Sequence, residues 1–227
     1  MRREESLRRG LTGAHLAIVW AVIETILAFV VGSRADSTML VALAHVTTVD
    51  ILTCLIGRAQ ITALLNGDGA AFGDYRHESL AFAIVGVTSL VATLSVSVRT
   101  LLHFHPAAWS VSHTQYAEAI TIAGSSTLVW YVLARLKRGV AATLQSEALH
   151  ADANGAFYSA CVAGGVLLAL ALLWFASWAP LDSVSALLIG GLLIWQGMYG
   201  VRTALHVHRR ARDDDDASLR VSRYAPR

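Results

Sequence analysis

Long apolar runs recur six times along the chain, with short polar breaks between them. A helix needs about 20 apolar residues to cross the hydrocarbon core of a bilayer, because unpaired backbone groups are too costly there. Six segments meet this requirement, with boundaries near residues 11–31, 39–65, 80–102, 116–136, 151–176 and 184–205. The pattern therefore predicts an all-α membrane protein with six transmembrane helices.

The composition agrees with this fold class. Of the 227 residues, 55% are hydrophobic and only 15% are charged, whereas a soluble domain carries about a quarter charged residues. Three prolines and two cysteines exclude a collagen-like chain and a disulfide scaffold. The net charge of +2 comes from residues in loops and tails, so no nucleic-acid partner is indicated. We expect a multi-pass protein of the cell membrane, surrounded by the lipid bilayer.

The basic residues predict the orientation in the membrane. All Lys and Arg residues except Arg34 and Arg99 fall in or beside the N-terminal arm, the second and fourth loops, or the C-terminal tail. Because positive charge accumulates on the cytoplasmic side, both termini should be cytoplasmic. The chain then divides into an arm (1–10), a transmembrane domain (11–208) and a short polar tail (209–227), which we expect to be solvated and flexible.

The second apolar segment carries the most informative polar residues: His45, Asp50 and Cys54. A charged side chain at bilayer depth costs on the order of 3 kcal/mol, so it normally faces a partner or water. On a helix Asp50 and Cys54 share a face, whereas His45 lies about 140° from Asp50 and forms no i, i+4 pair with it. Asp50 is predicted to bind a cation or a proton. The alternative is a neutral Asp50 bonded to Thr47 and neighbouring helices.

The fifth segment opens with a polar cluster that contains His150 and Asp152. The preceding loop is predicted to be cytoplasmic, which places the cluster at the cytoplasmic mouth. The helix dipole also favours a carboxylate at this position, so Asp152 has a structural explanation as well. Glu24 and Glu118 lie in other segments, where each either forms part of a proton path or bonds to another helix.

The loop between the second and third segments is a candidate secondary site. It holds Asp68, Asp74, His77 and Glu78. Aspartate and histidine in one short loop could hold a divalent metal. The alternative is that Glu78 caps the third helix and pairs with Arg76.

Small residues in the fifth and sixth segments predict that these two helices pack tightly against each other, because small side chains let helices approach closely. These residues are Ala160, Gly164, Gly165, Gly190, Gly191, Gly197 and Gly200.

Three stretches resemble the cation diffusion facilitator (cation efflux) family. Residues 72–82 (FGDYRHESLAF) are similar to the family's Tyr/Phe-Gly-x-x-Arg-x-Glu-x-Leu segment. Residues 146–160 (SEALHADANGAFYSA) resemble the start of its fifth span, and residues 179–205 resemble its sixth span. The resemblance implies a cation-efflux-like bundle and a homodimer that exports a divalent metal, commonly zinc, by antiport against protons. The chain would be a divergent member that lacks the family's C-terminal cytoplasmic domain.

In that family the central metal site uses two side chains four residues apart on the second span and two more on the fifth. Asp50 matches one of these positions, and the other three fall on Val46, Gly155 and Ser159. A divergent site would draw on other side chains of ligand type. The candidate metal ligands are therefore Asp50, His45, Asp152, Cys54 and His150.

Three functions compete at this point. The first is a metal transporter, in which a divalent cation is the substrate. The second is a membrane-embedded enzyme or small-molecule-binding protein, with His45 and Asp50 as acid and base. Its pocket would be lined by Trp130, Tyr131, Phe157 and Tyr158. The third is a non-transporting subunit that pairs with a complete exporter.

Overall fold

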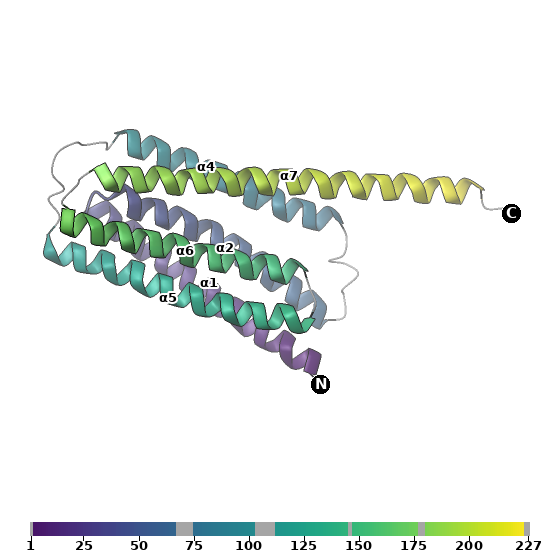
Figure 1. Ribbon diagram of the computed structural model, residues 1–227. Helices are drawn as coiled ribbons and strands as arrows, with labels where there is room; N and C mark the ends of the chain where they lie inside the picture. Colours follow the sequence, from purple (N-terminus) through teal and green to yellow (C-terminus); the bar gives the residue numbers. More distant parts are fainter. Residues whose placement is uncertain (1, 67–74, 103–111, 145–146, 177–179, 225–227) are drawn as a thin grey trace.

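The computed structural model describes residues 2–66, 75–102, 112–144, 147–176 and 180–224, and this part of the chain is helical apart from short turns. The helices are labelled as in Figure 1. They are α1 (Arg2–Arg34), α2 (Thr38–Leu65), α4 (Tyr75–Leu102), α5 (His113–Leu144), α6 (Glu147–Ala176) and α7 (Pro180–Tyr224).

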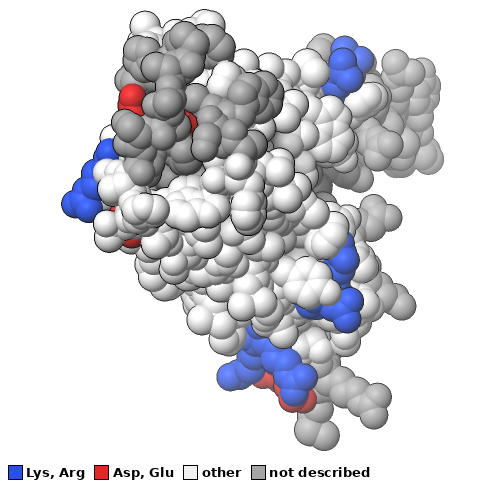
Figure 2. Space-filling view, turned by 60° about the vertical axis from the view of Figure 1, so that its left-hand side comes forward, with Lys and Arg blue, Asp and Glu red and all other residues white. Residues whose placement is uncertain are grey.

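Six helices are long and apolar enough to cross a membrane, as the sequence pattern predicts. Each predicted segment coincides with one of them, and the helices continue for several residues beyond the apolar runs. Large apolar side chains such as Leu94, Leu101 and Phe175 are exposed on the outside of the bundle. The face in Figure 2 carries charged side chains mainly toward its margins. This surface suits lipid rather than water.

The helices form two groups around α2. Helices α1, α2, α5 and α6 pack as one group, through the pairs α1–α2, α5–α6 and α1–α5. Helices α4 and α7 lie side by side as the second group, which runs along α2 (Figure 1). Helix α2 contacts α1, α4, α6 and α7 and is the most buried of the six. Polar residues on α2 are therefore placed in the centre of the bundle.

Glycines bring α4 and α7 into close contact. A Cβ atom at Gly86 of α4 would lie 2.8 Å from the backbone nitrogen of Val201 and 2.9 Å from the carbonyl oxygen of Gly197 on α7. Gly200 faces Gly86 as well. The prediction that the fifth and sixth segments pack tightly against each other is thus wrong. The sixth segment, α7, packs closely against α4 and makes far fewer contacts with α6. Small residues identify a close approach but not which helix makes it.

A buried carboxylate ties α7 to α2 at the end of the bundle away from the termini. Asp182, in the first turn of α7, accepts hydrogen bonds from Ser37 Oγ at 2.6 Å and from Thr38 N and Oγ1 at 2.7 Å. Ser37 is also the N-cap of α2 and accepts from Leu40 N. Asp182 therefore satisfies backbone and hydroxyl donors that would otherwise be buried without partners.

The two chain ends lie at the same end of the bundle (Figure 1). Helix α7 runs past the other helices to Tyr224, so the polar tail predicted to be flexible has a helical backbone up to that residue. No glycine or proline occurs between Val201 and Ala225 to stop the helix. The part of α7 that is apolar enough to cross a membrane ends at His206.

Candidate functional site

A buried ion pair joins α5 to α6 inside the bundle. Lys137 Nζ lies 2.8 Å from Asp152 Oδ1, and the two side chains are only 8% and 14% exposed. The charge pattern assigned Lys137 to a cytoplasmic loop, which is wrong because α5 continues to Leu144 and carries Lys137 about two turns before its end. Burial of two charges in an apolar bundle is costly, and in membrane proteins such groups mark functional sites.

Two side chains of α2 complete this cluster. Cys54 Sγ accepts a hydrogen bond from Lys137 Nζ at 3.6 Å and is 2% exposed. Asp50, one turn earlier on the same face, is 6% exposed and interacts electrostatically with Lys137 and Asp152. Its Oδ2 atom has no hydrogen-bond partner among the described residues. We call Asp50, Cys54, Lys137 and Asp152 the buried ionic cluster.

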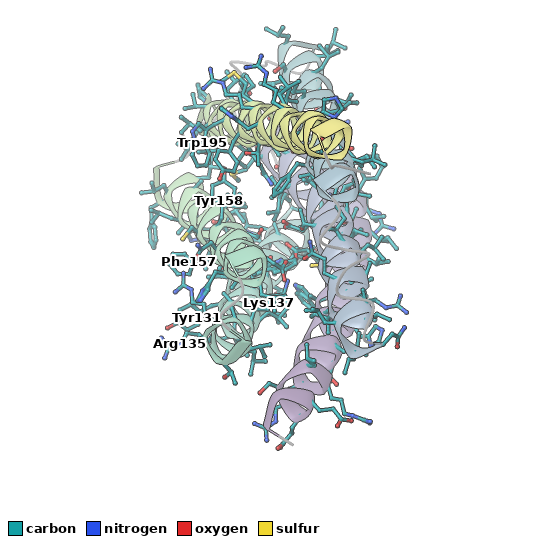
Figure 3. All side chains as sticks on the ribbon, turned by 90° about the vertical axis from the view of Figure 1, so that its right-hand side faces the viewer. Tyr131, Arg135, Lys137, Phe157, Tyr158 and Trp195 are labelled. Atoms are coloured by element: carbon teal, nitrogen blue, oxygen red, sulfur yellow. The ribbon has the colours of Figure 1, made fainter. Side chains whose placement is uncertain are left out.

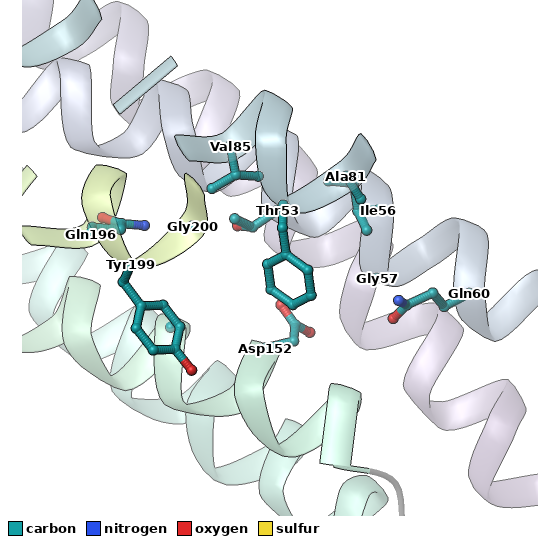
Figure 4. Close-up of a pocket in the computed structure, with 12 residues that line it drawn as sticks. Thr53, Ile56, Gly57, Gln60, Ala81, Val85, Asp152, Gln196, Tyr199 and Gly200 are labelled. Carbon is teal, nitrogen blue, oxygen red and sulfur yellow. The ribbon is translucent and has the colours of Figure 1, made fainter. Parts of the chain in front are cut away.

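A cavity of about 210 Å³ leads to this cluster between α2, α4, α6 and α7. In Figure 4 the Asp152 carboxylate points into it. A Cβ atom at Gly57 of α2 would lie 3.3 Å from Asp152 Oδ2, so the absence of a side chain there lets the carboxylate approach α2. The cavity is lined by Thr53, Ile56, Gly57, Gln60, Ala81, Phe82, Val85, Asp152, Gly155, Gln196, Tyr199 and Gly200.

Glu24 forms a second buried polar centre, on α1. It is 1% exposed and accepts hydrogen bonds from Ser126 Oγ and from Trp130 Nε1, the latter at 2.7 Å, both on α5. Of the two alternatives drawn from the sequence, Glu24 is thus seen bonding to another helix. It also interacts electrostatically with Asp50, which links the two polar centres. Glu118 is exposed on the outside of α5.

The predicted histidine ligands lie away from the buried ionic cluster. His45 donates from Nδ1 to the Val41 carbonyl at 2.8 Å, and its Nε2 accepts from Ser95 Oγ of α4 at 2.9 Å. His45 therefore faces α4 rather than Asp50, in line with the angle between them on the helix. His150 is exposed. In the described part of the chain, no three His, Cys, Asp or Glu side chains group closely enough to hold a metal ion.

The candidate secondary site cannot be placed in this structure. Asp68 and Asp74 lie outside the described residues. His77 and Glu78 belong to the first turn of α4, and their side chains lie outside the described part as well.

The aromatic residues proposed to line a substrate pocket do not come together. Trp130 is buried against Glu24, whereas Tyr131 and Phe157 are 46% and 37% exposed. The guanidinium carbon of Arg138 lies 4.7 Å from the centre of the Phe157 ring. Figure 3 shows Tyr131 and Phe157 toward the outside of the bundle and Lys137 toward its interior. None of the four aromatic residues, Tyr158 included, lines the cavity beside Asp152.

Lys137 was missed although the sequence contains a signal for it. It is the only lysine in the chain, and it continues a stripe of residues that α5 buries. The stripe consists of Trp130, Leu133, Ala134, Lys137 and Ala141. Spacings of three and four residues place all of them on one helix face. A helical pattern extended past 136 therefore predicts a buried lysine.

No protein-family model matches the chain, and no curated protein matches it. The fold and site themselves define the class: a bundle with six helices able to cross a membrane and a buried ionic cluster beside a cavity.

Proposed function

We propose that this protein is a transporter that exports a divalent metal cation, zinc in the first instance, in exchange for protons. The observation that carries the proposal is the buried Lys137–Asp152 ion pair beside Asp50 and Cys54. Ionisable groups at this depth face substrate pathways in membrane proteins. Asp152 lines the cavity, so a cation in the cavity would meet this member of the cluster first.

The chemistry of the cluster suits zinc. Carboxylate oxygens of Asp50 and Asp152 and the sulfur of Cys54 are ligand types that Zn²⁺ accepts, and tetrahedral sites with fewer than four protein ligands keep room for water. In the described structure these three groups do not lie close enough together to hold an ion, so zinc binding would require them to approach one another. The metal competes with protons for Asp50 and Cys54, whereas Asp152 is already ionised in its pair with Lys137. Binding on one side of the membrane therefore releases protons from these two groups, and rebinding of protons there releases the metal. This competition is the basis of the exchange.

The resemblance to cation diffusion facilitators sets the remaining parts of the proposal: a homodimer in the cell membrane, with both termini in the cytoplasm. The excess of arginine at the ends of the chain supports this orientation. Lys137 lies about two turns, and Asp152 about one and a half turns, from the end of the bundle where the termini are, so the cluster would open to the cytoplasm for efflux.

Reconstituted liposomes test the proposal. Wild-type protein should move Zn²⁺ down an imposed gradient and move protons across the membrane in the opposite direction. Zinc that enters the liposomes should therefore make the lumen more alkaline, and zinc that leaves should make it more acidic, as read by zinc-sensitive and pH-sensitive dyes. Asp50→Ala and Asp152→Asn should abolish both fluxes, because each removes a negative ligand. Glu118→Gln, an exposed carboxylate on α5, is the matched control and should retain both. Equal fluxes in all four proteins would refute the proposed site.

A second candidate function has support from the cavity lining. Phe82 and Tyr199 lie in the same cavity as the amides of Gln60 and Gln196, with the Asp152 carboxylate at one side. Apolar and aromatic walls with a few polar groups are typical of sites for small organic molecules. A small-molecule-binding protein or membrane enzyme would bind an organic cation there with no dependence on Asp50. Saturable organic-cation binding in Asp50→Ala, together with no zinc flux in the wild type, would favour this function.

A further inference from the structure

We propose that Lys137 is the resident cation of the transport site: its ammonium group holds the position next to Asp152 and Cys54 until a divalent metal displaces it. This inference rests on the proposed function and deepens it, because it names the residue that limits metal affinity and selects the charge of the substrate. Lys137 would be a positioning and specificity-determining residue rather than a ligand.

The contacts of Lys137 place it where a cation would bind. Its Nζ atom donates to Asp152 Oδ1 at 2.8 Å and to Cys54 Sγ at 3.6 Å, and these are two of the candidate metal ligands. An ammonium group is a compact point charge without acceptor atoms, as a bare cation is. A metal ion that reached the same two atoms would have to replace the ammonium group.

The site needs a positive charge when no substrate is present. Asp152 is 14% exposed, and a buried carboxylate without a partner is strongly unfavourable. Arg138, the next residue along α5, turns elsewhere: it donates to Asn154 and lies over the ring of Phe157. Among the described side chains, Lys137 is thus the basic group that pairs with Asp152.

Displacement of Lys137 is sterically feasible because its stem is long and the end of α5 is near. The helix ends at Leu144, about two turns further on, or roughly 10 Å along the axis. Lysine side chains in membrane helices extend along the helix to bring the ammonium group to a polar surface. Rotation about its four-carbon stem can therefore move the ammonium group off the ligands without unfolding α5.

Competition with a resident cation selects for charge. At equal distance a divalent ion gains twice the Coulomb energy of a monovalent ion from the same carboxylates. A monovalent ion gains no more than the ammonium group it replaces, so Na⁺ and K⁺ are excluded while Zn²⁺ enters. The same competition keeps zinc binding weak enough for release on the far side, which transport requires.

Three substitutions at Lys137 test the inference in purified full-length protein titrated with Zn²⁺. In Lys137→Met the resident cation is gone, so zinc should bind at least about tenfold more tightly, within the usual range of coupling between ligands. Lys137→Gln keeps a donor for Asp152 without the charge and should show the same gain. Lys137→Arg restores the charge and should return the zinc Kd to within about threefold of wild type.

A purely structural role for Lys137 predicts the opposite order, with weaker zinc binding in Lys137→Met and no selectivity change. In the proposed arrangement, the neutral variants also lose selectivity, so that 100 mM K⁺ competes with zinc in them but not in the wild type. Zinc binding in Lys137→Gln that is equal to or weaker than in the wild type overturns the inference alone. Absence of zinc binding in the wild type and in all three variants overturns the proposed function, and the inference with it.

Discussion

Gly57 of α2 faces Asp152 of α6 so closely that a Cβ atom on the glycine would lie 3.3 Å from the carboxylate oxygen Oδ2. The missing side chain leaves room on one side of Asp152, while Lys137 holds the other carboxylate oxygen. Gly57 and Asp152 both line the cavity. The geometry of the candidate site thus depends on one glycine of the central helix as much as on the charged groups.

Gly57→Leu should fill the cavity beside Asp152 and abolish zinc flux in liposomes while the protein still folds. A leucine side chain would occupy space that the carboxylate and the cavity now share, and overpacking of this kind costs roughly 1–3 kcal/mol. Gly139→Ala on α5, where a Cβ atom would meet nothing within 4 Å, is the control and should leave flux unchanged. Normal flux in Gly57→Leu would separate the cavity from the transport route.

Asp182→Ala should destabilise the bundle by roughly 2–4 kcal/mol, because it leaves the buried donors of Ser37 and Thr38 without their acceptor. The loss should appear as a lower midpoint of thermal unfolding in detergent. Asp36→Asn is the matched control: Asp36 is 57% exposed and lies 3.8 Å from Arg99, so its ion pair is worth less than about 1 kcal/mol. Equal midpoints for the two variants would contradict the conclusion that the Asp182 hydrogen bonds stabilise the contact between α2 and α7.

Gly86→Leu should separate α4 from α7, since even a Cβ atom at this position would lie 2.8 Å from the backbone of Val201. Backbone cannot move aside as a flexible side chain can, so the helices must part and lose contacts. We expect a lower unfolding midpoint and faster proteolysis within α4. Gly191→Leu, on α7 with nothing within 4 Å of its added Cβ atom, should behave like the wild type. A stable Gly86→Leu protein would mean that the α4–α7 contact is looser than described.

The sequence predicts the six helices well because a membrane span leaves a long, unmistakable apolar run. It predicts helix partners poorly. The glycines of α7 indicate a close approach to another helix, but Gly86, which packs against Gly197 and Gly200, lies more than 100 residues earlier in the chain. Nothing in either local pattern links the two positions, so the sixth segment was paired with the fifth instead of the third.

The candidate site shows the same limit at the level of single side chains. Asp50 and Cys54 could be identified because they interrupt an apolar segment and share a helix face. Lys137 was assigned to a loop because basic residues cluster there, although the buried stripe of α5 includes it. Its contact with Cys54 crosses between helices, 83 residues apart in sequence. Contacts between helices of this kind depend on how the helices pack, which local periodicity does not record.

Glu24 accepts hydrogen bonds from two groups that differ in the partners they can use. Trp130 Nε1 can only donate, so it needs an acceptor oxygen, whereas the Ser126 hydroxyl can donate or accept. Glu24→Gln supplies an oxygen for Trp130 and an amide for Ser126, and should lower stability by less than about 1 kcal/mol. Glu24→Leu leaves both groups buried and unpaired and should cost roughly 2–4 kcal/mol. Thermal unfolding in detergent measures both. Glu24 either holds α1 against α5 or forms part of the proton path, and zinc-driven proton flux in Glu24→Gln distinguishes these two roles. Unchanged flux assigns Glu24 to the contact between α1 and α5, whereas loss of flux in a stable protein assigns it to the proton path.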